Sequence, residues 1–247
     1  MTSFVIPSFQ RPTIFKEQTL AFLKKHKIDE KDIYLVLRED DPYLNDYLDR
    51  ATDINVLITD VKGIGKTHNY ITEYFDENAF IVEIDDDLID LFDNERKPIE
   101  SFMTVVEDMK SLMNDEGISY GGTYQVVNPL FMSGCKQYTT DLRYMLGCLR
   151  FRFVRKELFL ETNYAEDFEN CIKHFIRDKK ILKNNWVAPK TKNYQNGGCK
   201  NDGRDNETEK NDKLMLSQKY PEYCRLFQRK NERWDLRLRQ YSSKKTI

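Results

Sequence analysis

Cysteine and histidine are scarce in this sequence. Its 247 residues include five cysteines and three histidines, and no two cysteines have CxxC spacing. An odd number of cysteines without that spacing argues against a disulfide framework and against a zinc site. The pattern instead indicates free thiols in a reducing compartment, so we expect a cytoplasmic protein.

Long apolar runs are missing as well. A membrane-spanning helix needs about 18 consecutive apolar residues, and no run here approaches that length. The first residues, MTSFVIPSFQRP, lack the basic region and apolar stretch of a secretory signal. We therefore expect a globular protein that is not secreted. The length suits one large domain, or one domain with an extension.

A complete phosphate-binding loop is also absent, although GIGKT at residues 63–67 resembles the end of one. The motif GxxxxGK[ST] would put its first glycine at position 60, where this chain has Asp60. A carboxylate there repels phosphate and lacks the backbone freedom of glycine. We therefore expect Gly63 and Gly65 to form a turn before a helix rather than a nucleotide triphosphate site.

The charge is unevenly distributed along the chain. Residues 171–247 contain 20 Lys and Arg against 9 Asp and Glu, whereas residues 1–170 contain 19 against 32. The acidic body of -13 and the basic third of +11 nearly cancel in the net charge of -2. Such asymmetry indicates a polyanionic partner at one end, and a lysine-rich solvated surface explains it equally well.

Strands alternate with helices over the first half of the chain. The apolar patterns predict strands at 4–9, 32–39, 54–59 and 80–88, and helices at 12–27, 66–75 and 99–113. This alternation predicts an α/β fold with a mostly parallel sheet, whose functional sites lie at the carboxyl ends of the strands.

The pattern changes after residue 117. We expect antiparallel strands within 120–131 and 146–159, a helix at 166–178, a strand at 181–189, a long polar loop at 190–212 and a helix at 213–239. Residues 1–200 would then form the main domain. Residues 201–247 would form a basic extension packed on the same domain.

The strongest chemical signal is the run Asp85-Asp86-Asp87, which follows the apolar stretch FIVEI. Adjacent carboxylates repel one another unless a cation neutralises them. Asp85 and Asp87 point to the same side if strand geometry persists. Two hard oxygen donors beside a cleft suit Mg²⁺ or Mn²⁺ shared with a substrate diphosphate. The alternative is an acidic turn whose aspartates cap the next segment.

A second acidic pair, Glu166-Asp167, opens the helix at 166–178. It is either ordinary capping of a helix amino terminus or a general base that takes a proton from an acceptor hydroxyl. We expect His26 and His174 to be solvated. His68, in the helix after the glycine turn, is a candidate for contact with a phosphate.

The order of these motifs resembles a GT-A fold glycosyltransferase that uses a nucleotide sugar. The motifs are IPSFQRP at the first strand, GIGKTHNYI, IVEIDDDL, the EDFE helix and a late NGGC at 196–199. They are similar to those of the TET-associated glycosyltransferases of phages and other large-genome viruses, a family linked to modified DNA bases. His68 stands where arginine is commoner in that family.

The resemblance implies a Rossmann-like GT-A domain and a role for each motif. Asp167 would be the catalytic base, with Glu166 in reserve, and Asp85 and Asp87 would hold Mn²⁺ or Mg²⁺. The residues implied at the UDP-sugar donor are Pro7, Ser8, Arg11, Glu39, Gly65, Lys66, His68, Asn69, Asp85 and Asp86. Those expected at the acceptor or nucleic acid, from the late motif and the basic carboxyl-terminal run, are Gly197, Gly198, Lys200, Arg229, Lys230 and Arg233.

The function that follows is transfer of a sugar from a UDP-sugar to a hydroxyl on a modified pyrimidine in DNA, of the 5-hydroxy or 5-hydroxymethyl type. One alternative is a glycosyltransferase that acts on a viral protein or glycan. Others are a nucleotidyltransferase and a non-catalytic nucleic-acid-binding module. The sequence leaves open the sugar, the anomeric outcome, the acceptor and the oligomeric state.

Overall fold

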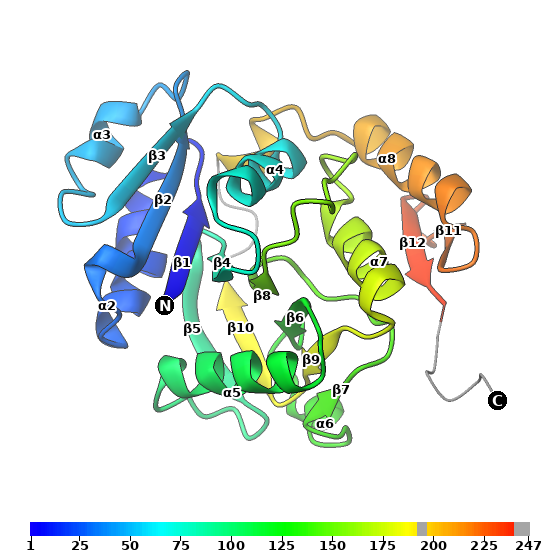
Figure 1. Ribbon diagram of the computed structural model, residues 1–247. Helices are drawn as coiled ribbons and strands as arrows, with labels where there is room; N and C mark the ends of the chain where they lie inside the picture. Colours follow the sequence, from blue (N-terminus) through cyan, green and yellow to red (C-terminus); the bar gives the residue numbers. More distant parts are fainter. Residues whose placement is uncertain (192–196, 240–247) are drawn as a thin grey trace.

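The structure is a computed structural model that describes residues 1–191 and 197–239. The strands of its main sheet are β1 (Thr2–Pro7), β2 (Ile33–Arg38), β3 (Asn55–Thr59), β4 (Phe80–Ile84), β6 (Tyr120–Thr123), β7 (Tyr138–Thr139), β8 (Leu149–Phe153) and β9 (Leu182–Asn184). Within the described residues this sheet has eight strands, in the order β3-β2-β1-β4-β8-β6-β9-β7 (Figure 1).

The sheet has a parallel half and a mixed half. β3, β2, β1 and β4 are parallel neighbours, and β8 lies antiparallel between β4 and β6. β6 pairs parallel with β9, which pairs antiparallel with β7. This arrangement confirms the predicted α/β class with a mostly parallel sheet and antiparallel strands beyond it.

Helices cover both faces of the sheet. The α-helices are α1 (Pro12–Phe15), α2 (Ala21–Lys25), α3 (Leu44–Leu48), α4 (Ile64–Tyr74), α5 (Phe102–Asp115), α6 (Pro129–Met132), α7 (Glu166–Asp178) and α8 (Asn206–Lys219). A π-helical segment, η1 (Lys16–Leu20), joins α1 to α2, and the short 3₁₀ turns are η2 (Glu30–Asp32) and η3 (Gly198–Lys200).

The alternation of side chains along the strands fixes the two faces. Phe4 and Ile6 of β1 lie in the large core with α2 and α5, through side chains such as Phe22 and Phe102. Val5, on the opposite face of β1, lies in a smaller core with Ile71 and Phe75 beside α4. β1, β2 and β4 are therefore buried on both sides, as their near-continuous apolar sequences require, whereas the edge strand β3 exposes Ile58.

Two predicted elements near the middle of the chain differ from the structure. The run 80–88 is divided, because β4 ends at Ile84 and β5 (Leu88–Asp93) begins only after the three aspartates and pairs with β10 (Val187–Thr191). Of the strand expected within 120–131, only β6 forms, and Pro129 then begins α6. Proline cannot donate to a strand ladder but is favoured at the first position of a helix.

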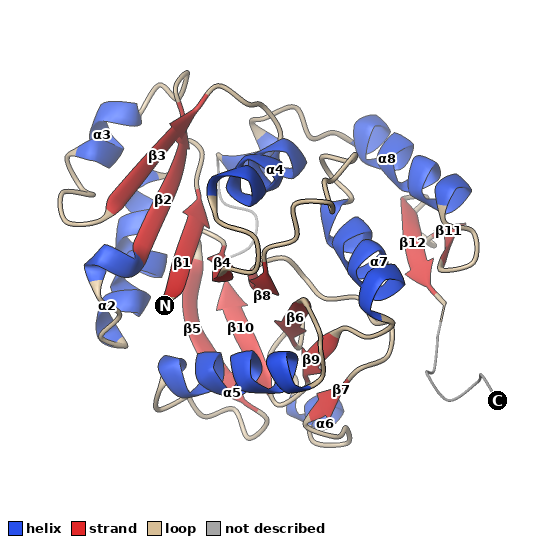
Figure 2. Ribbon diagram, viewed as in Figure 1, coloured by secondary structure: helices blue, strands red, loops and turns tan. Residues whose placement is uncertain are grey.

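The carboxyl-terminal prediction was wrong in its secondary structure. The loop expected over 190–212 contains η3 and the start of α8; residues 192–196 of that loop lie outside the described residues. The helix expected over 213–239 ends at Lys219, and a hairpin of β11 (Cys224–Gln228) and β12 (Trp234–Leu238) follows. Figure 2 shows this hairpin beside α8. Asp205 caps α8 by accepting from the Thr208 amide at 2.7 Å.

The described part of the extension packs against α7. Ala165, Phe168 and Ile172 form one apolar cluster with Leu216 of α8 and with Leu236 of the hairpin. Burial of these side chains holds the extension on the main body. Within the described residues, no helix is both long and apolar enough to cross a membrane.

Candidate functional site

A cavity of about 810 Å³ opens where β1, β2 and β4 end, beside the amino terminus of α7 and the segment after residue 197. The predicted site residues that line it are Pro7, Ser8, Arg11, Asp85, Asp86, Asp87, Glu166, Asp167, Gly198, Arg229 and Arg233. The two acidic motifs thus share one cavity, although about 80 positions separate them in the sequence.

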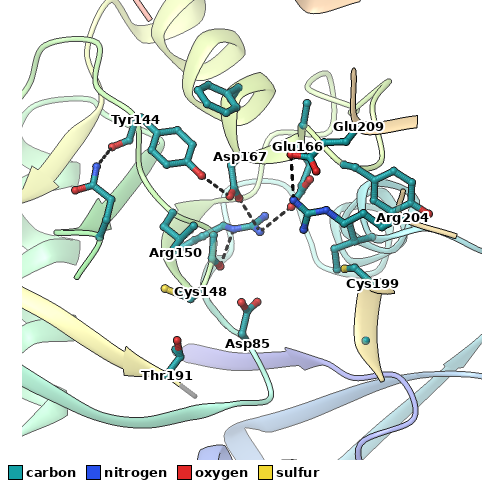
Figure 3. Close-up of a pocket in the computed structure, with 18 of the residues that line it drawn as sticks. Asp85, Tyr144, Cys148, Arg150, Glu166, Asp167, Thr191, Cys199, Arg204 and Glu209 are labelled. Atoms are coloured by element: carbon teal, nitrogen blue, oxygen red, sulfur yellow. Dashed lines mark hydrogen bonds and ion pairs between the residues drawn. The ribbon is translucent and has the colours of Figure 1, made fainter. Parts of the chain in front are cut away.

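The three aspartates at the end of β4 have different surroundings. Asp86 accepts from Ser8 Oγ at 2.6 Å and from Arg11 Nη1 at 3.1 Å. Asp87 Oδ2 lies 4.0 Å from the same Arg11 nitrogen. Asp85 is anchored through its main chain, where its carbonyl accepts from Thr19 Oγ1 at 2.6 Å, and its carboxylate faces the cavity (Figure 3).

The electrostatics of this cluster favour a cation. Burial, followed by the charge of Asp87, raises the pKa of Asp85 to about 7. Burial, followed by the charge of Asp86, raises the pKa of Asp87 to about 6. Two raised carboxyl pKa values in one cavity show negative charge that the protein compensates only in part.

Asp85 and Asp87 fit a divalent metal held jointly with a substrate. In the part of the chain that the structure describes, no group of three or more His, Cys, Asp or Glu is placed to enclose a metal ion. Mg²⁺ and its analogues are usually held by one or two carboxylates together with water and substrate phosphates. The donor set present here therefore matches a shared site and does not match a closed protein cage.

Glu166 and Asp167 begin α7 and meet a buried arginine from β8. Asp167 Oδ1 lies 3.3 Å from Arg150 Nη2, and its Oδ2 accepts from the Tyr144 hydroxyl at 3.1 Å (Figure 3). Glu166 Oε1 lies 3.9 Å from Arg150. Burial, followed by the charge of Asp167, raises the pKa of Glu166 to about 8. A proton on Glu166 is therefore favoured at neutral pH.

Arg150 connects this pair to a second set of buried charges beneath the cavity. Its Nε donates to the Gly147 carbonyl at 3.0 Å, and Nη1 lies 2.9 Å from His68 Nε2. His68 Nδ1 lies 2.5 Å from Glu83 Oε2. Because Arg150 can only donate, His68 Nε2 must accept, and the proton of the neutral ring lies on Nδ1 toward Glu83. Burial, followed by the charge of Arg150, lowers the pKa of His68 and favours that neutral form.

The structure therefore does not bring His68 to the donor. Its side chain is 5% exposed and is enclosed by Glu83 and Arg150. His174 is also buried rather than solvated, since its Nδ1 lies 2.7 Å from Ser119 Oγ and its ring stacks on Tyr120. Both rings lie in the interior because sheet and helix contacts enclose them on every side.

Four other predicted donor residues lie outside the cavity lining. A Cβ at Gly65 would be 1.9 Å from the Thr162 carbonyl oxygen, so this glycine permits close packing of α4. Asn69 exchanges hydrogen bonds with the main chain of Leu160 at 2.7 and 2.8 Å. Lys66 and Glu39 are exposed. The glycine-turn helix thus packs on the segment around residue 162, and it reaches the cavity through Ile64 and Thr67 instead of the predicted residues.

The late glycine motif packs over the loop after β1. Gly198 N donates to the Phe9 carbonyl at 2.8 Å, and Arg11 Nη2 donates to the Gly197 carbonyl at 3.1 Å. Gly197 has φ +86, and a Cβ there would be 2.8 Å from Arg11 Cγ. The motif therefore closes one edge of the cavity over Arg11, while Lys200 is exposed and does not line it.

The predicted cations of the hairpin are paired with acids. Arg229 Nε donates to Asp235 at 2.6 Å, and Arg233 Nη2 donates to both oxygens of Glu209 at 2.7 Å. Lys230 is exposed and lies outside the cavity lining. Arg204 and Lys213 share the same two acids, so four cations pair with two carboxylates and this part of the cavity keeps positive charge. Arg237 of β12 also lines the cavity.

Sequence reasoning missed several residues that shape the cavity. Arg38, at the end of β2, lies over the Phe9 ring at 4.0 Å and forms an ion pair with Asp202. Asp202 Oδ2 also accepts from Gly63 N at 3.0 Å. No sequence motif indicates these contacts between distant segments.

Arg150 is the exception, because the alternation Leu149-Arg150-Phe151-Arg152-Phe153 places charge on a strand between two other strands. Arg150 and Arg152 are both buried. A charged side chain enclosed in this way requires a buried acidic partner, and the structure supplies Asp167 and Glu83.

No family model and no curated protein match this chain. Solved structures do match it, among them glucosyl-3-phosphoglycerate synthase from Mycobacterium tuberculosis in complex with Mn²⁺, UDP and phosphoglyceric acid. That match has a TM-score of 0.54 at 15% identity and covers 98% of this chain and 87% of the other.

Further crystal structures of the same synthase give similar values. Its complex with UDP has a TM-score of 0.56 at 14% identity over 98% and 88% of the two chains. Its complex with Mn²⁺, UDP-glucose and phosphoglyceric acid has a TM-score of 0.55 at 14% identity over 88% and 79%. At such identities the likeness concerns the fold, and the fold of this chain is the α/β fold of the GT-A glycosyltransferases.

Proposed function

We propose that this chain is a metal-dependent glycosyltransferase that moves a sugar from a UDP-sugar to an acceptor hydroxyl. The observation that carries the proposal is one cavity that holds both the Asp85–Asp87 cluster and the Glu166-Asp167 pair. The first supplies the ligands of a metal bound to a diphosphate, and the second supplies a proton acceptor. The synthase structures of similar fold contain Mn²⁺ or Mg²⁺ with UDP or UDP-glucose, which supports the same donor class here.

Asp85 and Asp87 would hold the metal, which supplies positive charge for the leaving diphosphate. Asp86 has a different role in this proposal. Its bonds to Ser8 and Arg11 fix the loop after β1 at the edge of the cavity. Pro7, Ser8 and Arg11 would contact the nucleotide, and Arg38, held on Phe9, would border the same part of the cavity.

Asp167 would take the proton of the acceptor hydroxyl in an inverting transfer. The Tyr144 hydroxyl and Arg150 would stabilise a negative charge on Asp167. Burial, followed by the charge of its neighbour, raises the pKa of Glu166 to about 8, and a carboxyl group with a raised pKa beside a second carboxyl group is a common arrangement for acid–base chemistry. Glu166 is the reserve for the same role.

The finer acceptor hypothesis is a modified pyrimidine in DNA, and it rests on the resemblance to the TET-associated family. The +11 charge of residues 171–247 supports it. Arg229 pairs with Asp235 and Arg233 pairs with Glu209. Because Arg204 and Lys213 share these two acids, the pairing leaves positive charge on this side of the cavity. A protein or glycan acceptor is the alternative.

We keep residues 1–200 as the transferase domain and 201–247 as its extension. Asp202, Arg204 and Glu209 of the extension line the cavity, so this segment would contribute to the site. The five free cysteines support a cytoplasmic location.

The test is mass spectrometry after incubation of the protein with Mn²⁺ and a panel of UDP-sugars. The acceptors are DNA with hydroxylated pyrimidines, small hydroxy compounds and glycans. Transfer to any of them, or release of UDP by slow hydrolysis, supports the proposal. Pyrophosphate release from nucleoside triphosphates without use of any UDP-sugar would instead indicate a nucleotidyltransferase.

A further inference from the structure

The cavity extends beyond the catalytic carboxylates to a wall that the proposed mechanism does not use. This wall is formed by β9 and by the segments around residues 124 and 143. Its lining includes Tyr124, Gln125, Arg143, Lys183 and Asn185. It lies on the mixed half of the sheet, on the other side of β8 from the aspartates of β4.

Lys183 is the unusual group on this wall. It is 4% exposed, and its Nζ donates to the Tyr144 carbonyl at 3.2 Å and lies 4.9 Å from the centre of the Tyr124 ring. Within residues 1–191 and 197–239, its ammonium has no carboxylate partner. A buried lysine without a paired acid is rare in proteins.

The groups around Lys183 do not compensate its charge. Arg143 adds a second positive charge, which Asp141 partly neutralises at 2.8 Å from the Arg143 Nε. Burial lowers the pKa of Lys183 to about 8, so the ammonium still predominates at neutral pH. The buried thiol of Cys171 and the half-buried Cys135 are the other titratable groups near it. A charged, poorly solvated ammonium that faces a cavity is suited to an anion.

Tyr144 connects this ammonium to the catalytic pair. Its carbonyl accepts from Lys183 and from Gln125 Nε2, and its hydroxyl donates to Asp167. Lys183 and Asp167 are therefore bound to the two ends of one tyrosine, and both line the same cavity. A small molecule with a hydroxyl at one end and an anionic group at the other can contact both residues.

We propose that Lys183, with Arg143 beside it, binds a phosphate or carboxylate group of the acceptor while the hydroxyl of that acceptor lies at Asp167. This inference rests on the proposed transferase function, because it names the acceptor class of the same cavity. The anion belongs either to a small phosphorylated or carboxylated hydroxy compound or to a nucleotide phosphate next to a modified base.

The test is calorimetric titration of inorganic phosphate into the full chain saturated with UDP and Mn²⁺, which fill the donor side. Lys183→Met keeps the apolar stem and removes the charge, and it should weaken phosphate binding by about 10-fold to 100-fold. Lys180→Met is the matched control, because Lys180 is partly exposed and pairs with Glu116 away from the cavity lining. It should leave phosphate binding unchanged.

Arg143→Gln changes a partly exposed loop residue, and it keeps the test decisive if Lys183→Met does not fold. It should also weaken phosphate binding, by a smaller factor. The inference would be overturned if phosphate did not bind the wild-type protein. It would also be overturned if phosphate bound both variants with the same affinity as the wild type.

Competition with phosphate then identifies the source of the anion. If glycerol 3-phosphate competes with phosphate and glycerol does not, the acceptor is a small molecule. If a phosphorylated oligonucleotide competes, the acceptor is a nucleic acid. Either result supports the subsite, and competition by neither would overturn its assignment to the acceptor. UDP binding is measured separately. A failure of the transferase proposal would therefore appear as absent UDP binding, and a failure of this inference as absent or unchanged phosphate binding.

Discussion

Raising the pH from about 6.5 to about 8 should destabilise the metal-free protein, because the cavity contains carboxylic acids whose folded-state pKa values are raised. The folded-state pKa of Asp85 is raised to about 7 and that of Glu166 to about 8. A raised acid pKa contributes stability that is complete below the unfolded-state pKa and is lost as the pH rises through the folded-state value. Both groups therefore release protons on unfolding in this range.

Other groups oppose part of this loss. An unfolded histidine is still half protonated at about pH 6.5, so each buried histidine, whose folded-state pKa is lowered, adds about 0.4 kcal/mol of stability over the window. Lys183, with its pKa lowered to about 8, adds about as much near pH 8. The two acids together lose about 2 kcal/mol, roughly two thirds of it from Glu166, and the net loss is about 1 kcal/mol.

The assay is urea unfolding of the protein in a metal chelator at the two pH values. Glu166→Gln should remove most of the pH dependence, and the exposed Glu222→Gln should leave it unchanged. Saturating Mn²⁺ with UDP should also reduce it, since the metal stabilises ionised Asp85. A stability that stays constant or rises with pH in the metal-free protein would refute the electrostatic account of the cavity.

Three further changes test separate contacts. Arg150→Met should cost about 3 kcal/mol in urea unfolding and reduce turnover sharply, because it leaves Asp167 beside other acids without its partner; full activity would contradict the proposed positioning. Gly65→Ala should cost about 1–3 kcal/mol through collision with the Thr162 carbonyl, whereas Gly134→Ala, whose nearest neighbour atom is 3.9 Å away, should be close to neutral. Leu216→Ala should cost about 2–5 kcal/mol if α8 packs on α7 as an integral part of the body, and separate unfolding of the extension would argue otherwise.

The sequence was most informative where each residue depends on its own neighbours in the chain. The alternation of apolar strands and helices predicted the parallel half of the sheet, and the position of Asp85–Asp87 after FIVEI predicted their place at its edge. Such patterns reflect burial on both faces of a strand.

The rest depended on contacts between distant segments. His68 follows a glycine turn, as a phosphate ligand would, but it lies on α4 between Glu83 of β4 and Arg150 of β8, which enclose it. The hairpin after α8 was mistaken for a helix because its apolar residues fit either period over a short run. Nothing in the sequence distinguishes Lys183 from the other lysines. Only the fold shows that its side chain is buried without an acidic partner.

The central claim is that Asp85 and Asp87 hold a metal together with the diphosphate of a UDP-sugar. The most direct measurement is calorimetric titration of UDP into the protein with Mn²⁺ or with a chelator, repeated on Asp87→Asn. We expect UDP binding that requires Mn²⁺ and weakens by about 10-fold or more in the variant. Equal UDP affinity with and without the metal, in both proteins, would contradict the account.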